Sequence, residues 1–206
     1  ATEHYNVAIG YAAGGSVTTG FDNTFIGGLA GDAITNASYN VAIGKEALSD
    51  DTLGSRSTAI GWSALGNQNF TSAANSYNTA VGFQAGLSVS TGTANTLIGG
   101  LAGDAQTTAS STTAVGYSAL GANTTGSNNT AVGKSALTAN TVGFSNTAVG
   151  QAALAANIDG DYNTALGWSA LDQSTGSSNT AVGSNSLGAN TTANNNTAVG
   201  VNSLYS

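Results

Sequence analysis

The sequence of 206 residues contains no proline, no cysteine and no methionine, and only 6% of its residues are charged. Average usage would give about ten prolines in a chain of this length. A solenoid of stacked β-coils explains their absence, because nearly every strand N–H is needed in the ladder between coils and proline has none to donate. The lack of cysteine excludes a fold held together by disulfides.

The scarcity of charge fits the same architecture. Equivalent positions on successive coils stack at about 4.8 Å, where like charges repel and neutral Asn and Thr do not. The net charge is −7, and the three basic residues are Lys45, Arg56 and Lys134. This balance excludes nucleic acid, which requires clustered Lys and Arg, and anionic membrane surfaces. No apolar run reaches 18 residues, so no membrane insertion is expected.

A catalytic set is also missing from the sequence. The only histidine is His4, no cysteine nucleophile exists, and the acidic residues are scattered singly. The glycine-rich segment from Gly27 to Gly31 lacks the lysine of a phosphate-binding loop, so its glycines are assigned to turns. We therefore expect a protein that is not an enzyme and needs no cofactor.

What the sequence does contain is a repeat, N-T-A-V-G and close variants, along its whole length. Of the eleven intervals between repeat glycines, nine are 17 residues, one is 21 and one is 16. Seventeen residues suffice for short strands and turns but not for a helix pair, so the sequence predicts one all-β domain, a parallel β-solenoid of about twelve coils spanning residues 1–206. The repeat glycines are Gly10, Gly27, Gly44, Gly61, Gly82, Gly99, Gly116, Gly133, Gly150, Gly167, Gly183 and Gly200.

The residue before each repeat glycine is always aliphatic, which predicts an inward core ladder. Alternation places the residue two positions earlier, Thr in ten of twelve copies, on the same side. The residue between them is Ala in ten copies, so we expect this second face to lie close to another chain. The predicted core ladder is Ile9, Ile26, Ile43, Ile60, Val81, Ile98, Val115, Val132, Val149, Leu166, Val182 and Val199.

A second strand is expected at the A-L pairs, such as Ala64-Leu65 and Ala136-Leu137. One Val or Ile plus one Leu buries roughly 3–6 kcal/mol of apolar side chain per coil, whereas ordering costs about 1.5 kcal/mol per residue. On this estimate a single chain buries too little apolar surface to offset the cost of ordering it, so we expect several chains to share a core. Twelve coils would form a rod roughly 58 Å long.

The repeats N-V-A-I-G-Y-A-A (Asn6 to Ala13) and N-V-A-I-G-K-E-A (Asn40 to Ala47) resemble those in the heads of trimeric autotransporter adhesins, the YadA-like heads. Later copies, such as Asn128 to Thr141, resemble the N-T-A-I-G-x-x-A-L repeats of bacteriophage tail fibres and bacterial surface proteins. The resemblance implies a left-handed β-roll and a homotrimer, displayed extracellularly on a cell or virion surface and engaged in attachment. The repeat of 17 residues is longer than that of the adhesin heads.

Large aromatic residues follow the repeat glycine in five coils, and we consider them as platforms for a host-surface glycan or receptor. The alternative, favoured by the usual behaviour of such residues, is that they seal turns or pack against a neighbouring chain. A second set, Tyr5, Tyr39, Tyr77 and Tyr162, has the same two interpretations. The candidate ligand-facing aromatics are Trp62, Tyr117 and Trp168, together with Phe70, which the 21-residue interval is expected to expose at the tip of an inserted loop.

One weak metal candidate is present. Asp159 and Asp161 flank a glycine and offer closely spaced oxygen ligands of the kind calcium prefers. The fragment lacks the rest of a calcium loop, so an ordinary polar turn is the favoured interpretation.

Three functions of different classes remain: a structural rod or filament subunit, an attachment domain of an adhesin or tail-fibre shaft, and an ice-binding solenoid. The chain begins near its first repeat and stops partway through a coil, which is consistent with a piece of a longer fibre or with end-to-end stacking into a filament. Ice binding requires ranks of T-x-T on one face, and here a single Thr precedes a core-side Val. Ice binding is therefore the least favoured of the three functions.

Overall fold

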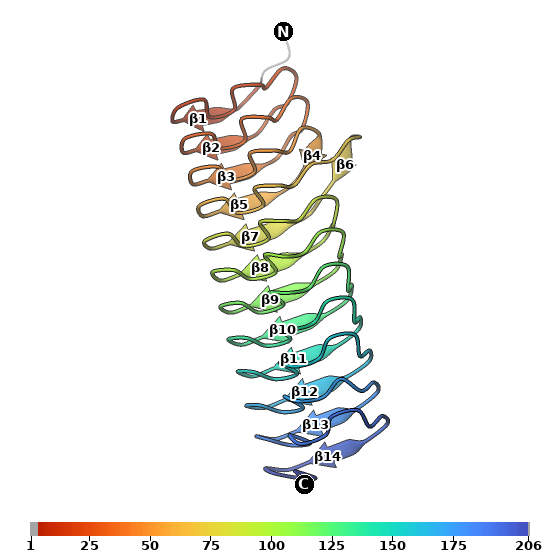
Figure 1. Ribbon diagram of the computed structural model, residues 1–206. Coiled ribbons are helices and arrows are strands. Elements are labelled where there is room, and N and C mark those ends of the chain that lie inside the picture. The colour runs from red at the N-terminus through yellow and green to blue at the C-terminus, as the bar shows by residue number, and fades with distance from the viewer. Residues whose placement is uncertain (1–3, 206) are drawn as a thin grey trace.

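The computed structural model describes residues 4–205 and shows a single stack of β-coils (Figure 1). Each coil contributes one short strand to a 12-stranded parallel sheet, in which every strand pairs with its counterpart in the next coil. The chain is an all-β parallel solenoid with a repeat of about 17 residues and about eleven turns, and residues 4–205 contain no helix. The strands of this sheet are β1 (Val7–Ile9), β2 (Thr24–Ile26), β3 (Val41–Ile43), β5 (Thr58–Ile60), β7 (Thr79–Val81), β8 (Thr96–Ile98), β9 (Thr113–Val115), β10 (Thr130–Val132), β11 (Thr147–Val149), β12 (Thr164–Leu166), β13 (Thr180–Val182) and β14 (Thr197–Val199).

The register of the sheet is the same at every step. Thr58 pairs with Thr79 across the 21-residue interval, and Thr164 pairs with Thr180 across the 16-residue interval. Because a slip of one residue would exchange the two faces of a strand, the insertion and the deletion must both be absorbed in turns. Nothing in the described chain forms a helix long and apolar enough to cross a membrane.

The strands face the opposite way from the prediction made from the sequence. The middle residue of each triplet points into the coil, as at Ala114 and Ala131, which are fully buried. The aliphatic residue before the repeat glycine points outward, and Leu166 and Val199 are 48% and 69% exposed. The coil is too narrow for two opposed aliphatic side chains, so alanine occupies its interior, and the outer Val and Ile reflect β-propensity. The predicted core ladder is therefore an outward column: Ile9, Ile26, Ile43, Ile60, Val81, Ile98, Val115, Val132, Val149, Leu166, Val182 and Val199.

The A-L pairs supply the rest of the apolar interior. Ala136 and Leu137 are fully buried, which confirms the predicted apolar contribution, but they lie in a turn and form no strand. Leu137 has a φ of 50°, in the left-handed region that costs a non-glycine residue roughly 1–2 kcal/mol. Burial of the leucine side chain contributes about 1.5–3 kcal/mol and offsets that cost.

Two coils replace the interior alanine with a larger residue, and glycine compensates nearby. Phe25 stands in the alanine column and is fully buried. Gly14 and Gly31 occupy the positions that hold leucine in most coils, and a Cβ at either would collide with the Phe25 ring. Leu97 has the same relation to Gly86 and Gly103. The volume of the interior is therefore approximately the same in each coil, although different residues fill it.

The repeat glycine is required by the close stacking of the backbone. Gly116 has a φ of 134°, a conformation that L-residues rarely adopt. A Cβ there would lie 2.6 Å from the carbonyl oxygen of Gly133 in the next coil. The whole column shares this geometry, so the invariance of the repeat glycine has a steric cause.

Two columns of buried asparagine join the coils. Asn129 Oδ1 accepts a hydrogen bond from the backbone N–H of Asn146 at 2.9 Å, and Asn129 Nδ2 donates to the Gly143 carbonyl at 2.7 Å. In the second column, Asn140 Nδ2 donates to Asn123 Oδ1 at 2.8 Å. Buried amides stabilise a fold when all their groups are paired, and here each links one coil to the next.

The irregular coil contains a short additional pairing, β4 (Gly54–Ser55) with β6 (Ala74–Asn75), which projects from the stack in Figure 1. Phe70 does not form the exposed tip predicted for this insertion. Its side chain is 6% exposed and lies beside Gly54, where a Cβ would approach the ring to 2.7 Å. A large apolar ring placed next to a glycine fills the extra space that the insertion opens.

A buried carboxyl group lies beneath this insertion. Asp51 is fully buried, and its Oδ1 accepts hydrogen bonds from the backbone N–H groups of Gly54 at 3.0 Å and Phe70 at 3.2 Å. Gln68 Nε2 donates to Asp51 Oδ2, and Gln68 Oε1 accepts from Asn78 Nδ2. Burial raises the pKa of the Asp51 carboxyl above its ordinary value of 3.8, although these hydrogen bonds oppose the effect.

Candidate binding surfaces

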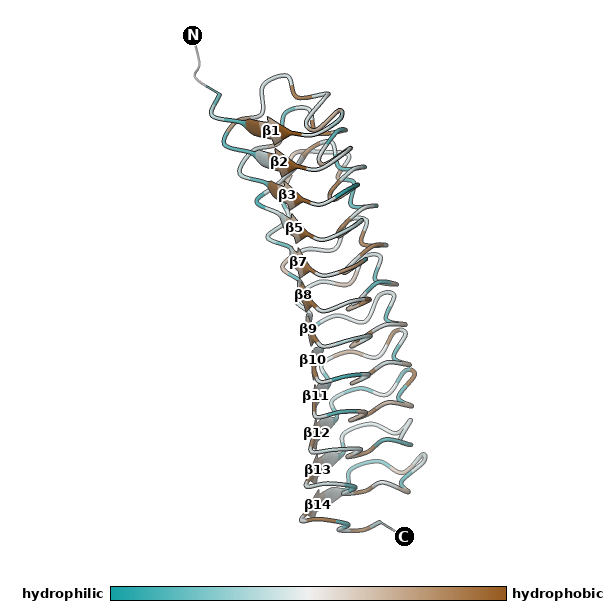
Figure 2. Ribbon diagram, turned by 90° about the vertical axis from the view of Figure 1, so that its left-hand side faces the viewer, coloured by the Kyte–Doolittle hydropathy of each residue, from teal (hydrophilic) through white to brown (hydrophobic). Residues whose placement is uncertain are grey.

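The outward side chains of the twelve strands form one continuous surface, the β-face. It consists of a Thr column and an aliphatic column, carried by the strands that stack in one line in Figure 2. None of the twelve triplets contains a charged residue. Ile98 and Leu166, on β8 and β12, are 39% and 48% exposed in the single chain. The β-face is thus an uncharged strip with aliphatic groups along its whole length.

The Thr residues of the β-face differ from the other Thr residues of the chain. In the turn opposite, Thr124 Oγ1 donates to the Thr141 carbonyl at 3.0 Å and Thr141 Oγ1 donates to the Ile158 carbonyl at 3.0 Å. Within residues 4–205, the hydroxyl groups of Thr113, Thr130 and their strand equivalents form no hydrogen bond with the protein. These hydroxyls are available to water or to another surface.

The aromatic residues that follow the repeat glycine are on the surface. Trp62 is 40% exposed, Tyr117 56% and Trp168 53%. Trp62 and Phe83 come from successive coils and stack with ring centroids 5.0 Å apart and an interplanar angle of 29°. Three of the four candidate aromatics are therefore surface side chains, and the fourth, Phe70, is buried.

Two of the four tyrosines just before the repeat asparagine pack against aromatic residues of neighbouring coils. Tyr39 meets Phe21 edge to face, with centroids 5.2 Å apart, and the Arg56 guanidinium lies 4.6 Å from the centroid of its ring. Tyr162 makes the same edge-to-face contact with Phe144 at 5.1 Å. Such contacts are typical of aromatic residues that seal a turn. They agree with the structural interpretation, with the neighbour supplied by the same chain.

A groove of about 470 Å³ crosses four coils on the side next to the aromatic column. The residues that line it include the ring of Trp62, the apolar Leu87 and the acidic residues Asp32, Glu46 and Asp50. Sequence reasoning missed this site, because the acids stand at different places in their repeats: Glu46 and Asp50 lie two and six positions after Gly44, and Asp32 lies five positions after Gly27. Alignment of the coils against one another would have placed these acids on adjacent turns.

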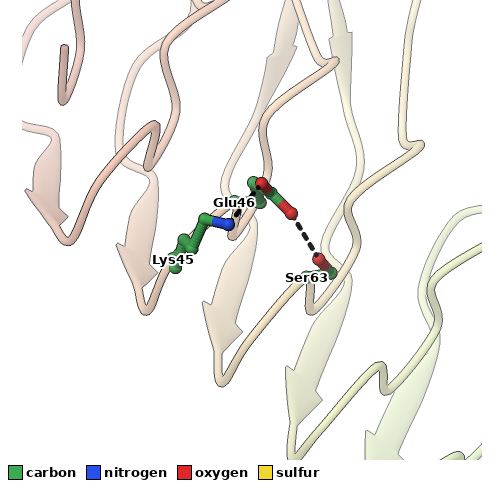
Figure 3. Close-up of polar contacts among 3 residues, drawn as sticks. All are labelled: Lys45, Glu46 and Ser63. Atoms are coloured by element: carbon green, nitrogen blue, oxygen red, sulfur yellow. Dashed lines mark hydrogen bonds and ion pairs between the residues drawn. The ribbon is translucent and has the colours of Figure 1, made fainter. Parts of the chain in front are cut away.

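One wall of the groove is fixed by contacts that cross between coils (Figure 3). Glu46 Oε2 accepts a hydrogen bond from Ser63 Oγ of the next coil at 3.2 Å, and Glu46 Oε1 lies 3.1 Å from Lys45 Nζ. The Lys45 side chain is 62% exposed, so solvent screens this ion pair and its contribution to stability is small. The contacts hold the Glu46 carboxylate in place.

Asp32 stands in a less favourable environment on the same groove. Burial raises the pKa of its carboxyl above the ordinary value of 3.8, and the negative charges of Asp50 and Glu46 raise it further, while a backbone hydrogen bond opposes them. Among the residues that the structure describes, none donates a hydrogen bond to its buried Oδ1 atom. The groove therefore has an excess of negative charge.

The candidate calcium ligands do not form a site. Asp161 Oδ1 accepts a hydrogen bond from the Phe144 backbone N–H at 2.9 Å, and Asp159 is exposed. Across residues 4–205, no three His, Cys, Asp or Glu side chains are grouped so that they could hold a metal ion. The segment is an ordinary polar turn, in which Asp161 takes the place of the serine that accepts the same bond in other coils, as Ser127 does from Ser110.

Comparison with known proteins adds no relative. No protein-family model matches the chain, and no curated protein or solved structure does either. The functional argument therefore depends on the solenoid and its surfaces.

Proposed function

We propose that this chain is a non-enzymatic rod for a surface fibre, which assembles side by side with copies of itself through the β-face and acts in attachment. One observation carries the proposal: a column of outward Val and Ile extends across all twelve strands of an uncharged face. Identical chains can meet there without burying a charge. The resemblance to adhesin heads and tail fibres supports three chains, a left-handed coil and display outside the cell or on a virion.

The size of the β-face is consistent with association. A strip about 10 Å wide and eleven coil spacings long covers roughly 500 Å². Two facing copies would bury about 1,000 Å², which is the lower bound for a specific interface. Continued stacking of coils from end to end would lengthen such a rod into a filament.

The test is the mass of the pure protein by light scattering. We expect about three times the 20.0 kDa of the single chain. Leu166→Asp places a charge in the aliphatic column and is expected to dissociate the assembly, whereas Ile158→Asp, on a turn away from the β-face, should leave the mass unchanged. A wild-type mass of one chain would refute assembly through this face.

A second candidate function is ice binding, and the outward orientation of the valines favours it. The Thr and Val side chains lie next to each other on the β-face and repeat at the coil spacing of about 4.8 Å. The Thr hydroxyl groups form no hydrogen bond with the described part of the protein. Inhibition of ice recrystallisation at micromolar protein, abolished by Thr113→Lys with Thr130→Lys, would support it. No inhibition would remove it.

A further inference from the structure

The groove beside Trp62 has the dimensions of a ligand site. Its volume of about 470 Å³ lies within the range of roughly 300–1,000 Å³ that is usual for small-molecule sites. Ser49 and Asn67 line it with polar groups, and Trp62 supplies a large apolar wall. Such a combination orients a ligand by hydrogen bonds while burying one of its apolar faces.

The Trp62 ring is held before any ligand arrives. Phe83, from the next coil, stacks against it at a centroid distance of 5.0 Å. The indole still has 40% of its surface exposed. A ring that is already fixed loses little rotational freedom on binding, which improves affinity. Aromatic rings of this kind pack against the C–H faces of sugars and attract cations through their π-electrons.

The charge of the groove restricts the ligand. Asp32, Glu46 and Asp50 contribute three carboxyl groups, and the adjacent cation, Lys45, pairs with Glu46 and extends into solvent. An anionic sugar would be repelled. Burial raises the pKa of Asp32, and repulsion from Asp50 and Glu46 adds to it. A cation would offset this cost and form charge-assisted hydrogen bonds with the carboxyl groups. A bare metal ion does not fit, because no three of the described acidic side chains are grouped to hold one.

We propose that this groove binds a saccharide carrying a protonated amino group, with its ring stacked on Trp62 and its ammonium paired with Asp50, in the negative field to which Asp32 and Glu46 also contribute. The hydroxyl groups of the sugar would bond to Ser49 and Asn67. This inference rests on the attachment role proposed above and names its ligand class. It assigns one site to coils that otherwise present a uniform surface.

The experiment is calorimetric titration of the full chain with a β-linked glucosamine trimer, and in parallel with its N-acetylated form, which is neutral. We expect the cationic trimer to bind at least tenfold more tightly, and its affinity to fall as salt is added. Asp50→Asn, at an exposed side chain, should weaken binding of the cationic trimer more than binding of the neutral one.

Trp168 provides the matched control, because it follows its repeat glycine just as Trp62 does but lies outside the groove. Trp62→Ala should lower affinity at least tenfold, and Trp168→Ala should not change it. Absence of binding at millimolar trimer, equal binding of the two trimers, or equal loss in both tryptophan variants would overturn the proposal. The mass of the assembly is measured separately, so failure of the groove is distinguishable from failure of assembly.

Discussion

Single residues determine how firmly one coil adheres to the next. Asn129 and Asn140 each extend a hydrogen-bonded column through the interior, and amides do this without the cost of a buried charge. Asp51 is the exception, since it occupies the second column as a carboxyl group. Its hydrogen bonds reduce the cost of burial but do not remove it, as the raised pKa shows.

We therefore predict that Asp51→Asn removes one contribution to the pH dependence of stability. The carboxyl pKa is raised in the fold above its ordinary 3.8, so the folded state binds the proton more tightly and wild-type stability falls as the pH rises from that value through the folded pKa. The Asn variant has no carboxyl group to titrate at this position, so its stability relative to the wild-type protein is expected to rise over the same pH range.

The measurement is denaturant unfolding of both proteins from pH 3 to pH 7. Other aspartates with raised pKa values, Asp32 and Asp104 among them, contribute equally to both proteins, so the difference isolates Asp51. A difference in stability that stays constant across the pH range would contradict the assignment.

At the scale of one coil, the interior is a fixed volume that different residue sets fill. Phe25 with Gly14 and Gly31 fills it in one way, and Ala42 with Leu48 in another. A segment that carries its own set of interior residues can therefore be repeated elsewhere in the stack. The 24-residue stretch from Gly10 to Ala33 recurs in this way from Gly82 to Ala105, with 17 identities.

A double-mutant cycle tests this volume rule. Phe25→Ala should cost roughly 3–5 kcal/mol of unfolding free energy through the cavity it leaves. Gly31→Leu alone should also destabilise, because the new side chain meets the Phe25 ring. The double variant recreates the Ala and Leu pair of other coils, and we expect it to recover at least half of the loss. Additive losses in thermal unfolding would refute the rule.

The repeat and its period were sufficient to predict the parallel solenoid, because the spacing of glycine fixes where each turn must fall. The orientation of the strands was not predictable by the usual rule, since Val132 is the more hydrophobic residue and Ala131 the buried one. Aliphatic character indicates burial only where the interior has room for it. Phe70 was predicted to be exposed but is buried, because the inserted residues form a small apolar interior of their own as well as a loop.

The groove was not recognised from the sequence because its residues come from neighbouring coils and from different positions in the repeat. Asp32 and Asp50 are 18 residues apart in sequence yet line the same depression. The aromatic residues, by contrast, were recognisable from a single column, and Trp62 lines that depression as well. The periodicity of the sequence shows directly which residues occupy the same position in successive coils. A site built from several repeat positions can be recognised only when the spatial arrangement of the turns is known.

At the scale of the whole molecule, the central claim is that the β-face is covered by copies of the same chain. Leu166 and Ile158 offer a matched pair, because their side chains are 48% and 49% exposed in the single chain and only Leu166 lies on the β-face. The sequence has no cysteine, so one introduced thiol can be followed without background.

The most direct measurement is the rate at which a thiol reagent labels Leu166→Cys and Ile158→Cys in the native protein. The account predicts that the thiol at position 166 is protected at least tenfold relative to that at position 158, and that the difference disappears when dilution or denaturant separates the chains. Equal labelling of the two native variants would contradict it.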